Sequence, residues 1–274
     1  MLYKTYCGTI VIVGKTNVGK STLFNQLINK KISIISKKRN TTQNYIFGVH
    51  TKKIYQTIYF DTPGIDLINK FNLNKLKKII YESDITIFIV ENISWDQNDE
   101  NTLNTIKNSS IPTLLIINKI DKLKNKMLLL PHINFLKKKF NFLEILPMSG
   151  KNKKNIDILI KIIYSLLPDR PHQYLKSYIT NCSTNFVVSE FIREQYMIYF
   201  NKELPYTITI QINSISINTK KEYIIKALIL VKKNRHKSIL IGKTGNKIKK
   251  CSIMAKKNIS CFFQRKVHLF IWIK

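Results

Sequence analysis

Hydrophobic residues along the first 170 positions gather in short runs of strand length, separated by longer segments in which apolar and polar residues mix as they do in helices. The runs are Ile10–Val13, Ile58–Phe60, Ile85–Val90, Leu114–Ile117 and Leu143–Leu146. Apolar strands that alternate with helices are typical of a parallel sheet covered by helices on both faces. This part of the chain is therefore predicted to be an α/β domain.

The pattern changes after the helix that ends this series. Ile156–Leu167 carries apolar residues at helical spacing, and Pro168 stops the helix. A helix-like stretch, Val188–Phe200, is then followed by two alternating segments, a second helical region and the strand Val267–Ile273. The expected divisions are an α/β domain over residues 1–170, a linker over 171–178 and a smaller α+β domain of order α-β-β-α-β over 179–274.

The net charge indicates an anionic partner. The chain has 46 Lys and Arg against 16 Asp and Glu, a formal charge of +30 at pH 7, and its 44% of hydrophobic residues argues against a disordered chain. Lys accounts for 41 of the basic residues, so we assign about half of the excess to a compositional bias on solvated faces. Residues 171–274 hold 19 basic and 4 acidic residues, which makes the smaller domain the more densely positive one.

The cysteines and the apolar runs favour a soluble chain in a reducing cytoplasm. The four cysteines, at positions 7, 182, 251 and 261, show neither the CxxC spacing of zinc sites nor an even disulfide framework. The run Thr9–Val13 leads straight into a glycine-rich loop instead of a cleavage site, so no signal peptide is expected. Every apolar run is shorter than the 18 or so residues that a transmembrane helix needs.

The first glycine-rich loop predicts a phosphate site. With only eight glycines in the chain, each position is informative. The sequence Gly14-Lys15-Thr16-Asn17-Val18-Gly19-Lys20-Ser21 follows the first predicted strand and precedes an amphipathic segment, which is the setting of a P-loop. Its backbone N–H groups would hold the β-phosphate, Lys20 would reach the β/γ oxygens, and the Ser21 hydroxyl would bind Mg²⁺.

Two further motifs follow predicted strands. In Asn118-Lys119-Ile120-Asp121, the Asp121 carboxylate can accept from both N1–H and the 2-amino group of guanine, a pattern that adenine cannot supply. Asp61-Thr62-Pro63-Gly64 is a DxxG, for which an ordinary turn is the alternative. Each motif is weak alone, and their order and spacing after the P-loop favour a GTP site.

The ordered motifs resemble those of translation-factor-related GTPases: a P-loop, the pair Thr41-Thr42, DxxG, NKxD and then Ser149-Gly150-Lys151 after a strand. Over nearly its full length the chain resembles the Era family of bacterial GTPases, in which a P-loop GTPase domain is joined to a type II KH RNA-binding domain. The other segments that carry the resemblance are Tyr6–Gly8, Leu130–His132, Ser189–Glu194, Glu203–Tyr206 and the GxxG near the C-terminus.

The resemblance implies roles for the nucleotide-site residues. Mg²⁺ would be held by Ser21, by the switch threonine Thr42 and, through water, by Asp61, while Lys20, the Gly64 amide and Asn17 would act in catalysis. At the position where Ras-like enzymes orient the attacking water with a glutamine, this chain has Ile65, so unaided hydrolysis should be slow. Asn17 stands where several related GTPases help to hold K⁺, and its alternative role is a hydrogen bond within the loop.

The GxxG of the smaller domain is Ile241-Gly242-Lys243-Thr244-Gly245. It follows two predicted strands and opens a helix that carries Lys247, Lys249 and Lys250, the setting in which a type II KH loop clamps four nucleotides of single-stranded RNA. We expect RNA contacts from residues 241–245, Lys247 and Lys250, and core packing for Ile239. The alternatives are that the isoleucines belong to the core and that the lysines form a solvated face.

In the Era family the RNA is the 3′ region of small-subunit ribosomal RNA, and the activity supports maturation of the small ribosomal subunit. The resemblance thus implies a monomeric, cytoplasmic GTPase that binds GTP, GDP and ribosomal RNA in ribosome biogenesis. Two alternatives are an RNA-binding assembly chaperone independent of GTP and a GTPase that uses its lysines on the anionic inner membrane. Departures from the family are Gln43 in place of an arginine after the threonines, a short segment after DTPG, and an end at Lys274 where relatives continue.

Overall fold

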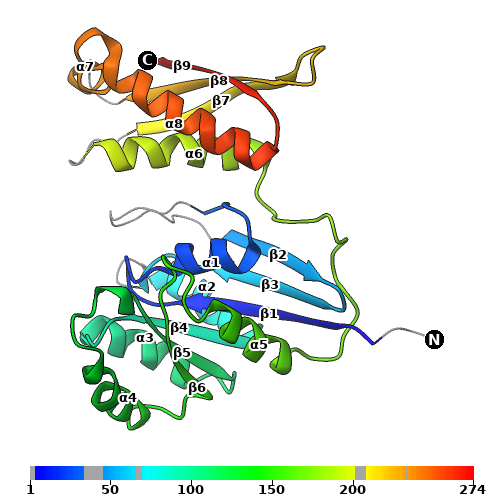
Figure 1. Ribbon diagram of the computed structural model, residues 1–274, viewed down its shortest axis with the longest axis vertical. Helices are drawn as coiled ribbons and strands as arrows, with labels where there is room; N and C mark the ends of the chain where they lie inside the picture. The colour runs from blue at the N-terminus through cyan, green and yellow to red at the C-terminus, as the bar shows by residue number, and fades with distance from the viewer. Residues whose placement is uncertain (1–3, 34–45, 66–69, 201–207, 232–233) are drawn as a thin grey trace. The chain divides into compact units, whose positions relative to one another are not determined.

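The computed structural model describes residues 4–33, 46–65, 70–200, 208–231 and 234–274 (Figure 1). Contacts between residues divide the chain into two units, of which the first ends at Asn181 and the second begins at Cys182.

The first unit is built on a six-stranded sheet of order β2-β3-β1-β4-β5-β6. The strands are β1 (Tyr6–Val13), β2 (Ile46–Lys52), β3 (Tyr55–Asp61), β4 (Ile85–Glu91), β5 (Thr113–Asn118) and β6 (Glu144–Pro147). All neighbouring pairs are parallel except β2 and β3. The five strands expected from their apolar runs are present, and the antiparallel edge strand β2 is an addition to the expected parallel sheet.

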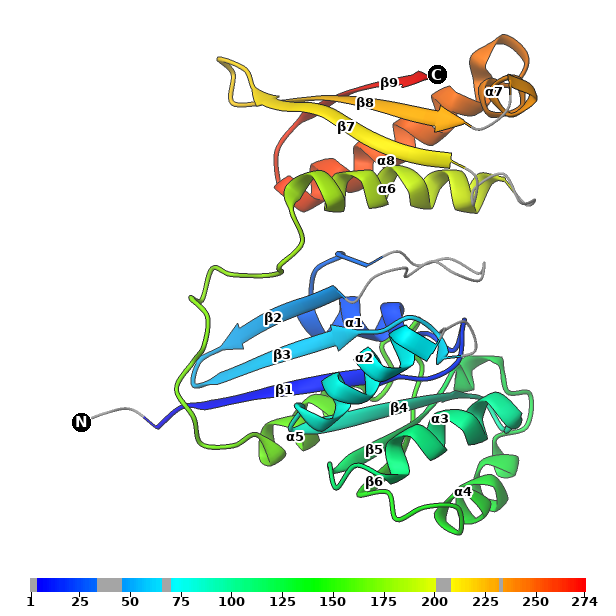
Figure 2. The same ribbon diagram turned by 180° about the vertical axis from the view of Figure 1, so that it is seen from behind.

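Helices cover both faces of this sheet. They are α1 (Lys20–Ile28), α2 (Lys70–Tyr81), α3 (Gln97–Lys107), α4 (Leu129–Lys137) and α5 (Ile156–Leu166). Figures 1 and 2 show α1 and α5 on one face and α2 and α3 on the other. Residues of α2, α3 and α4 share one buried cluster with residues of β1, β4 and β5. Because every residue of β5 is buried, its carboxyl end is a fixed platform for side chains.

The segment expected as a linker packs along the outer strands of the first unit. The side-chain oxygen of Gln56 accepts backbone N–H bonds from Gln173 at 2.8 Å and Tyr174 at 3.0 Å. Tyr174 and Tyr178 also pack against the buried cluster that contains Cys7. Residues 171–178 therefore belong, by their contacts, with the first unit.

The described part of the second unit combines three strands with three helices. They follow in the order α6 (Thr184–Tyr199), β7 (Ile208–Ile217), β8 (Tyr223–Val231), α7 (Asn234–Ile241), α8 (Asn246–Phe263) and β9 (Val267–Ile273). The sheet order is β7-β8-β9, with β8 and β9 parallel. The helix expected to open at the GxxG is α8, and α7, which precedes the GxxG, is an addition to the expected order. Gly242 and Gly245, each with a φ of +75°, separate the two helices, because a continuous helix cannot accommodate that φ.

Within the described ranges, no helix is long and apolar enough to cross a bilayer. Of the four cysteines, Cys7 and Cys251 are buried, Cys182 is half-buried, and Cys261 is exposed. Burial raises the pKa of the Cys251 thiol to about 11.

Candidate nucleotide and RNA sites

The P-loop joins β1 to α1 and is fixed against the end of β5. Gly19, directly before α1, has a φ of +107°, and a Cβ there would lie 2.2 Å from Nδ2 of Asn118. Any side chain at this position would push the loop away from β5. Val18 beside it is fully buried and anchors the loop to the core. The phosphate loop and the expected guanine-reading motif are thus in direct contact.

The two side chains expected to meet phosphate and metal are the first residues of α1. Lys20 folds back over the loop, and its Nζ donates to the carbonyl oxygens of Gly14 at 3.0 Å and Lys15 at 2.7 Å. Ser21 Oγ donates to Asp61 Oδ2 at 2.7 Å, so the DxxG motif at the end of β3 meets the P-loop. A hydroxyl and a carboxylate together form an oxygen donor set of the kind that Mg²⁺ prefers. These residues fit the expected metal site, while Thr42 lies outside the described residues.

The rest of the DxxG motif is held against β1 and the P-loop. The Thr62 hydroxyl donates to the Ile12 carbonyl at 2.7 Å, and the Ile65 N–H donates to the Gly14 carbonyl at 3.4 Å. These bonds place Pro63 and Gly64 beside the phosphate loop. The Ile65 side chain packs against the core cluster of the first unit, and its hydrocarbon chain has no group that can orient water.

The NKxD motif connects three loops at the end of β5. Asn118 Nδ2 donates to the Val18 carbonyl at 2.7 Å, and its Oδ1 accepts the Gly150 N–H at 2.9 Å. Ser149 Oγ donates to Asp121 Oδ1 at 2.5 Å, which orients that exposed carboxylate. The structure therefore brings together the expected guanine-reading residues, with Lys151 exposed in the turn that follows.

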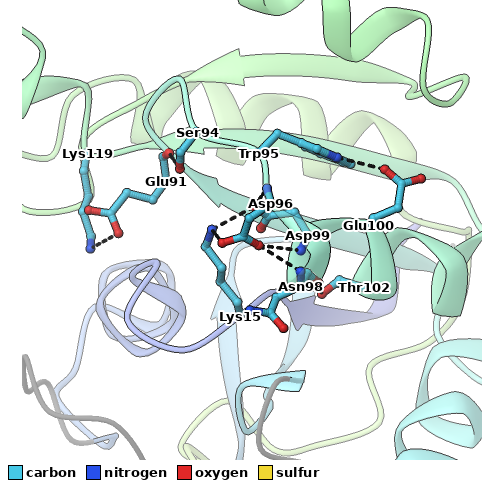
Figure 3. Close-up of polar contacts among 10 residues, drawn as sticks. All are labelled: Lys15, Glu91, Ser94, Trp95, Asp96, Asn98, Asp99, Glu100, Thr102 and Lys119. Carbon is cyan, nitrogen blue, oxygen red and sulfur yellow. Dashed lines mark hydrogen bonds and ion pairs between the residues drawn. The ribbon is translucent and has the colours of Figure 1, made fainter.

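Lys119 adds a second connection between this motif and the P-loop. Its Nζ donates to the carbonyl oxygen of Asn17 and forms an ion pair with Glu91 at 2.8 Å (Figure 3). Burial alone would raise the pKa of Glu91, but Lys119 and Lys122 outweigh it and hold that pKa below its usual range. The backbone of Asn17 is thereby fixed at a φ of +62°, and its side chain is exposed.

A carboxylate pair at the start of α3, absent from the expected site, holds the side chain of Lys15. Lys15 Nζ lies 2.8 Å from Asp96 Oδ2 and 2.8 Å from Asp99 Oδ2 (Figure 3). Asp96 and Asp99 also form a capping box, each accepting a backbone N–H from the other's position. Burial raises the pKa of Asp99, and the hydrogen bond from Lys15 opposes that rise. The Asp-x-x-Asp spacing is a signal of a helix start that the sequence contains. No local pattern in the sequence indicates that Lys15 is the partner of these two carboxylates.

The GxxG forms a tight turn between α7 and α8. Gly245 N–H donates to the Gly242 carbonyl at 3.2 Å, and Thr244 has a φ of +55°. Lys247 is half-buried, with Nζ 5.4 Å from the centre of the Phe200 ring, whereas Lys250 is exposed. The turn thus brings the backbone of residues 242–245 to the start of a basic helix, where an anion is favoured.

One expectation in this region is wrong. Ile239, expected in the core, is 40% exposed. The helix α7 is only two turns long, and Leu240 is the fully buried residue among residues 236–241, the part of the helix whose side chains the structure describes. The neighbouring position therefore points away from the core.

Comparison with known proteins covers both units. Residues 9–119 match the family described as 50S ribosome-binding GTPase, and residues 203–274 match the KH domain family. GTPase Era of Buchnera aphidicola from Acyrthosiphon pisum (strain APS) is 50% identical over 99% of this chain and 98% of its own length. GTPase Era of Actinobacillus pleuropneumoniae serotype 5b is 43% identical over 99% of this chain and 91% of its own.

Two solved structures are similar across the whole chain. A crystal structure of Era in complex with MgGDPNP and nucleotides 1506–1542 of 16S ribosomal RNA matches 98% of this chain and 93% of its own, with a TM-score of 0.89 and 33% identity. An Aquifex aeolicus Era variant bound to GDP and AlF₄⁻ matches 98% and 94%, again with a TM-score of 0.89 and 33% identity. The similarity therefore includes both units and their order along the chain.

Proposed function

Because the chain belongs to the Era family of GTPases, it hydrolyses GTP to GDP and phosphate, and we propose that this reaction controls its binding to the 3′ region of small-subunit ribosomal RNA during small-subunit assembly. One observation carries the proposal: a single chain holds a guanine-nucleotide site in one unit and a GxxG turn on a basic helix in the other. A relative with the same order of units was crystallised with both kinds of ligand, MgGDPNP and 16S ribosomal RNA. The protein would act as a monomer in the cytoplasm.

In the proposed site, the backbone of Gly14–Ser21 binds the phosphates and Asp121 reads guanine. Lys20 would exchange its bonds to two loop carbonyls for bonds to the β and γ oxygens. Ser21, Thr42 and, through water, Asp61 would hold Mg²⁺, which would supply positive charge against the phosphates. The Gly64 amide would donate to the γ-phosphate, where negative charge develops during hydrolysis.

We propose further that K⁺ supports hydrolysis through the exposed side chain of Asn17. The Ile65 side chain is partly buried against the core cluster and cannot hydrogen-bond water, so a cation is a suitable replacement. Replacing K⁺ by Na⁺ at equal ionic strength should slow single-turnover hydrolysis about tenfold or more, and Asn17→Ala should remove the difference between the salts. The matched control is Asn29→Ala, because Asn29 also has a positive φ, of +57°, but caps the far end of α1.

The K⁺ role is excluded if the wild-type protein hydrolyses GTP equally fast in both salts. If Asn17→Ala and Asn29→Ala both lose all hydrolysis, the loss is a general effect of alanine at a positive φ. Asn17→Gly is then the deciding variant, and K⁺ dependence in Asn17→Gly would show that the Asn17 side chain is not needed.

The RNA role is tested by chemical footprinting of small ribosomal subunits. With a GTP analogue bound, the protein should protect nucleotides in the 3′ region of the ribosomal RNA, and with GDP it should protect them less. Equal protection in both states would favour an assembly chaperone that works without GTP. Absence of protection in that region would contradict the proposed RNA target.

A second proposed role, peripheral membrane association, rests on one exposed segment. Met127 is 80% exposed and Leu130 is 70% exposed, next to the exposed Lys124 and Lys126. Exposed apolar side chains beside lysines suit the surface of an anionic bilayer. Wild-type protein should float with vesicles that contain phosphatidylglycerol, and Met127→Asp with Leu130→Asp should not. Leu175→Asp, at an equally exposed leucine, is the control.

A further inference from the structure

The sheet of the second unit has one covered face and one open face. Both α6 and α8 lie on one side of the sheet (Figures 1 and 2). In β8, Ile225, Ala227 and Ile229 are fully buried, so we assign them to the side that the helices cover. Phe270 and Trp272 of β9 are, in contrast, 48% and 50% exposed. Because successive side chains of a strand point to opposite faces, these two rings belong to the open face.

The two exposed rings are nearly parallel. Their centres lie 6.3 Å apart and their planes differ by 21°. Phe270 is paired in register with Lys226 of β8, and Trp272 is paired with Leu228. Flat aromatic rings on the open face of a sheet, with helices on the other face, are the means by which RRM domains stack the bases of single-stranded RNA. The two rings therefore form adjacent flat surfaces on which two planar groups can stack side by side.

The charge around the rings favours an anionic ligand. Lys226 and Lys274 are exposed, and neither forms an ion pair with any residue that the structure describes. The carboxylate that borders this face, Glu222, already binds Lys266 and His268 at 2.8 Å each. A second copy of the chain would bring the same positive charge to this surface and would be repelled.

We propose that the open face around Phe270 and Trp272 is a second RNA surface, on which two bases of a single strand stack while Lys226 and Lys274 face the phosphates. RNA bound here is a polyanion with flat, apolar faces, which matches both the rings and the charge. The surface uses residues separate from the turn Gly242–Gly245, so it goes beyond the RNA site of the proposed function.

Trp272 can report on its own occupancy. The chain has two tryptophans, and Trp95 lies in the other unit, where its Nε1 donates to Glu100 at 2.9 Å. In Trp95→Phe, all tryptophan emission comes from Trp272. Titration with a single-stranded RNA oligonucleotide of the small-subunit 3′ region should quench this emission in proportion to the RNA bound. The bound RNA should also protect Trp272 from quenching by iodide. Binding of the RNA with unchanged Trp272 emission would overturn the proposal.

Variants separate this surface from the GxxG turn. Phe270→Ala with Trp272→Ala should weaken RNA binding about tenfold or more, while Trp272→Phe, which keeps a ring, should stay within about twofold. Ile217→Ala removes a side chain that is 53% exposed on β7 and should change nothing. Circular dichroism and GTP affinity would show that each variant is folded.

The outcomes distinguish the two RNA sites. If Phe270→Ala with Trp272→Ala binds RNA like wild type, while Lys243→Asp with Thr244→Asp in the GxxG turn weakens binding, the second surface is disproved and the first stands. If neither change affects binding, both fail. A blue shift of Trp272 emission on vesicles or on self-association, without quenching by RNA, would assign the face to a membrane or to a second copy and overturn the proposal.

Discussion

Asp121→Asn should transfer nucleotide preference from GTP to XTP, with a loss of GTP affinity of about a hundredfold or more. The Asp121 carboxylate stands at the end of β5, where Ser149 orients one of its oxygens. The change replaces an acceptor of guanine's two donors by an amide, whose N–H₂ repels those donors and can bond the 2-oxo group of xanthine. Competition between GTP and XTP for a fluorescent GDP analogue measures the transfer.

The control for this prediction is Asp157→Asn. Asp157 is exposed in the first turn of α5, so the same chemical change there should leave GTP affinity within about twofold. Tight GTP binding by Asp121→Asn, with no gain for XTP, would show that Asn118–Asp121 does not read guanine.

Lys243→Asp with Thr244→Asp should reduce the affinity for single-stranded RNA about tenfold or more and lower its dependence on salt. Both residues lie between Gly242 and Gly245, so two carboxylates would face phosphates where the backbone has to approach them. The glycines that make the turn are kept, so the fold should survive. GTP affinity should also survive, because the P-loop belongs to the other unit.

The matched control is Lys256→Asp with Lys257→Asp. These lysines are exposed further along α8, so the control changes the charge by −4, against −3 in the turn variant, but does so away from the turn. Filter binding at several salt concentrations compares the two variants. If both lose the same affinity, the effect is one of total charge, and the turn is not the RNA site.

Local sequence patterns were sufficient for most of the fold. The central strands are buried on both faces, so Leu114–Ile117 is an uninterrupted apolar run and Ile85–Val90 is interrupted only by the buried Thr86. The edge strand β2 was not predicted, because Ile46–Lys52 mixes apolar and polar residues and is defined by its pairing with β3. The two glycines predicted the GxxG loop and the helix that follows it, but not the short helix α7 that precedes it.

The candidate site was predictable where it depends on motifs and not where it depends on distant pairs. The P-loop, DxxG and NKxD residues meet because strand ends share one edge of a sheet. The ion pair from Lys15 to Asp99 joins positions 84 residues apart, and no local pattern indicates it. In β9 the residues of both faces are mostly apolar, so only the structure shows that Phe270 and Trp272 are exposed.

In the proposed function, the bound nucleotide sets the affinity of the protein for RNA. The most direct test is to measure the dissociation constant of the same RNA for the protein in its two nucleotide states. The RNA is the single-stranded 3′ region of small-subunit ribosomal RNA, and the protein is saturated with Mg²⁺ and either a non-hydrolysable GTP analogue or GDP. We predict binding about tenfold tighter with the GTP analogue, a coupling typical of two linked sites. Equal dissociation constants in the two states would contradict the account.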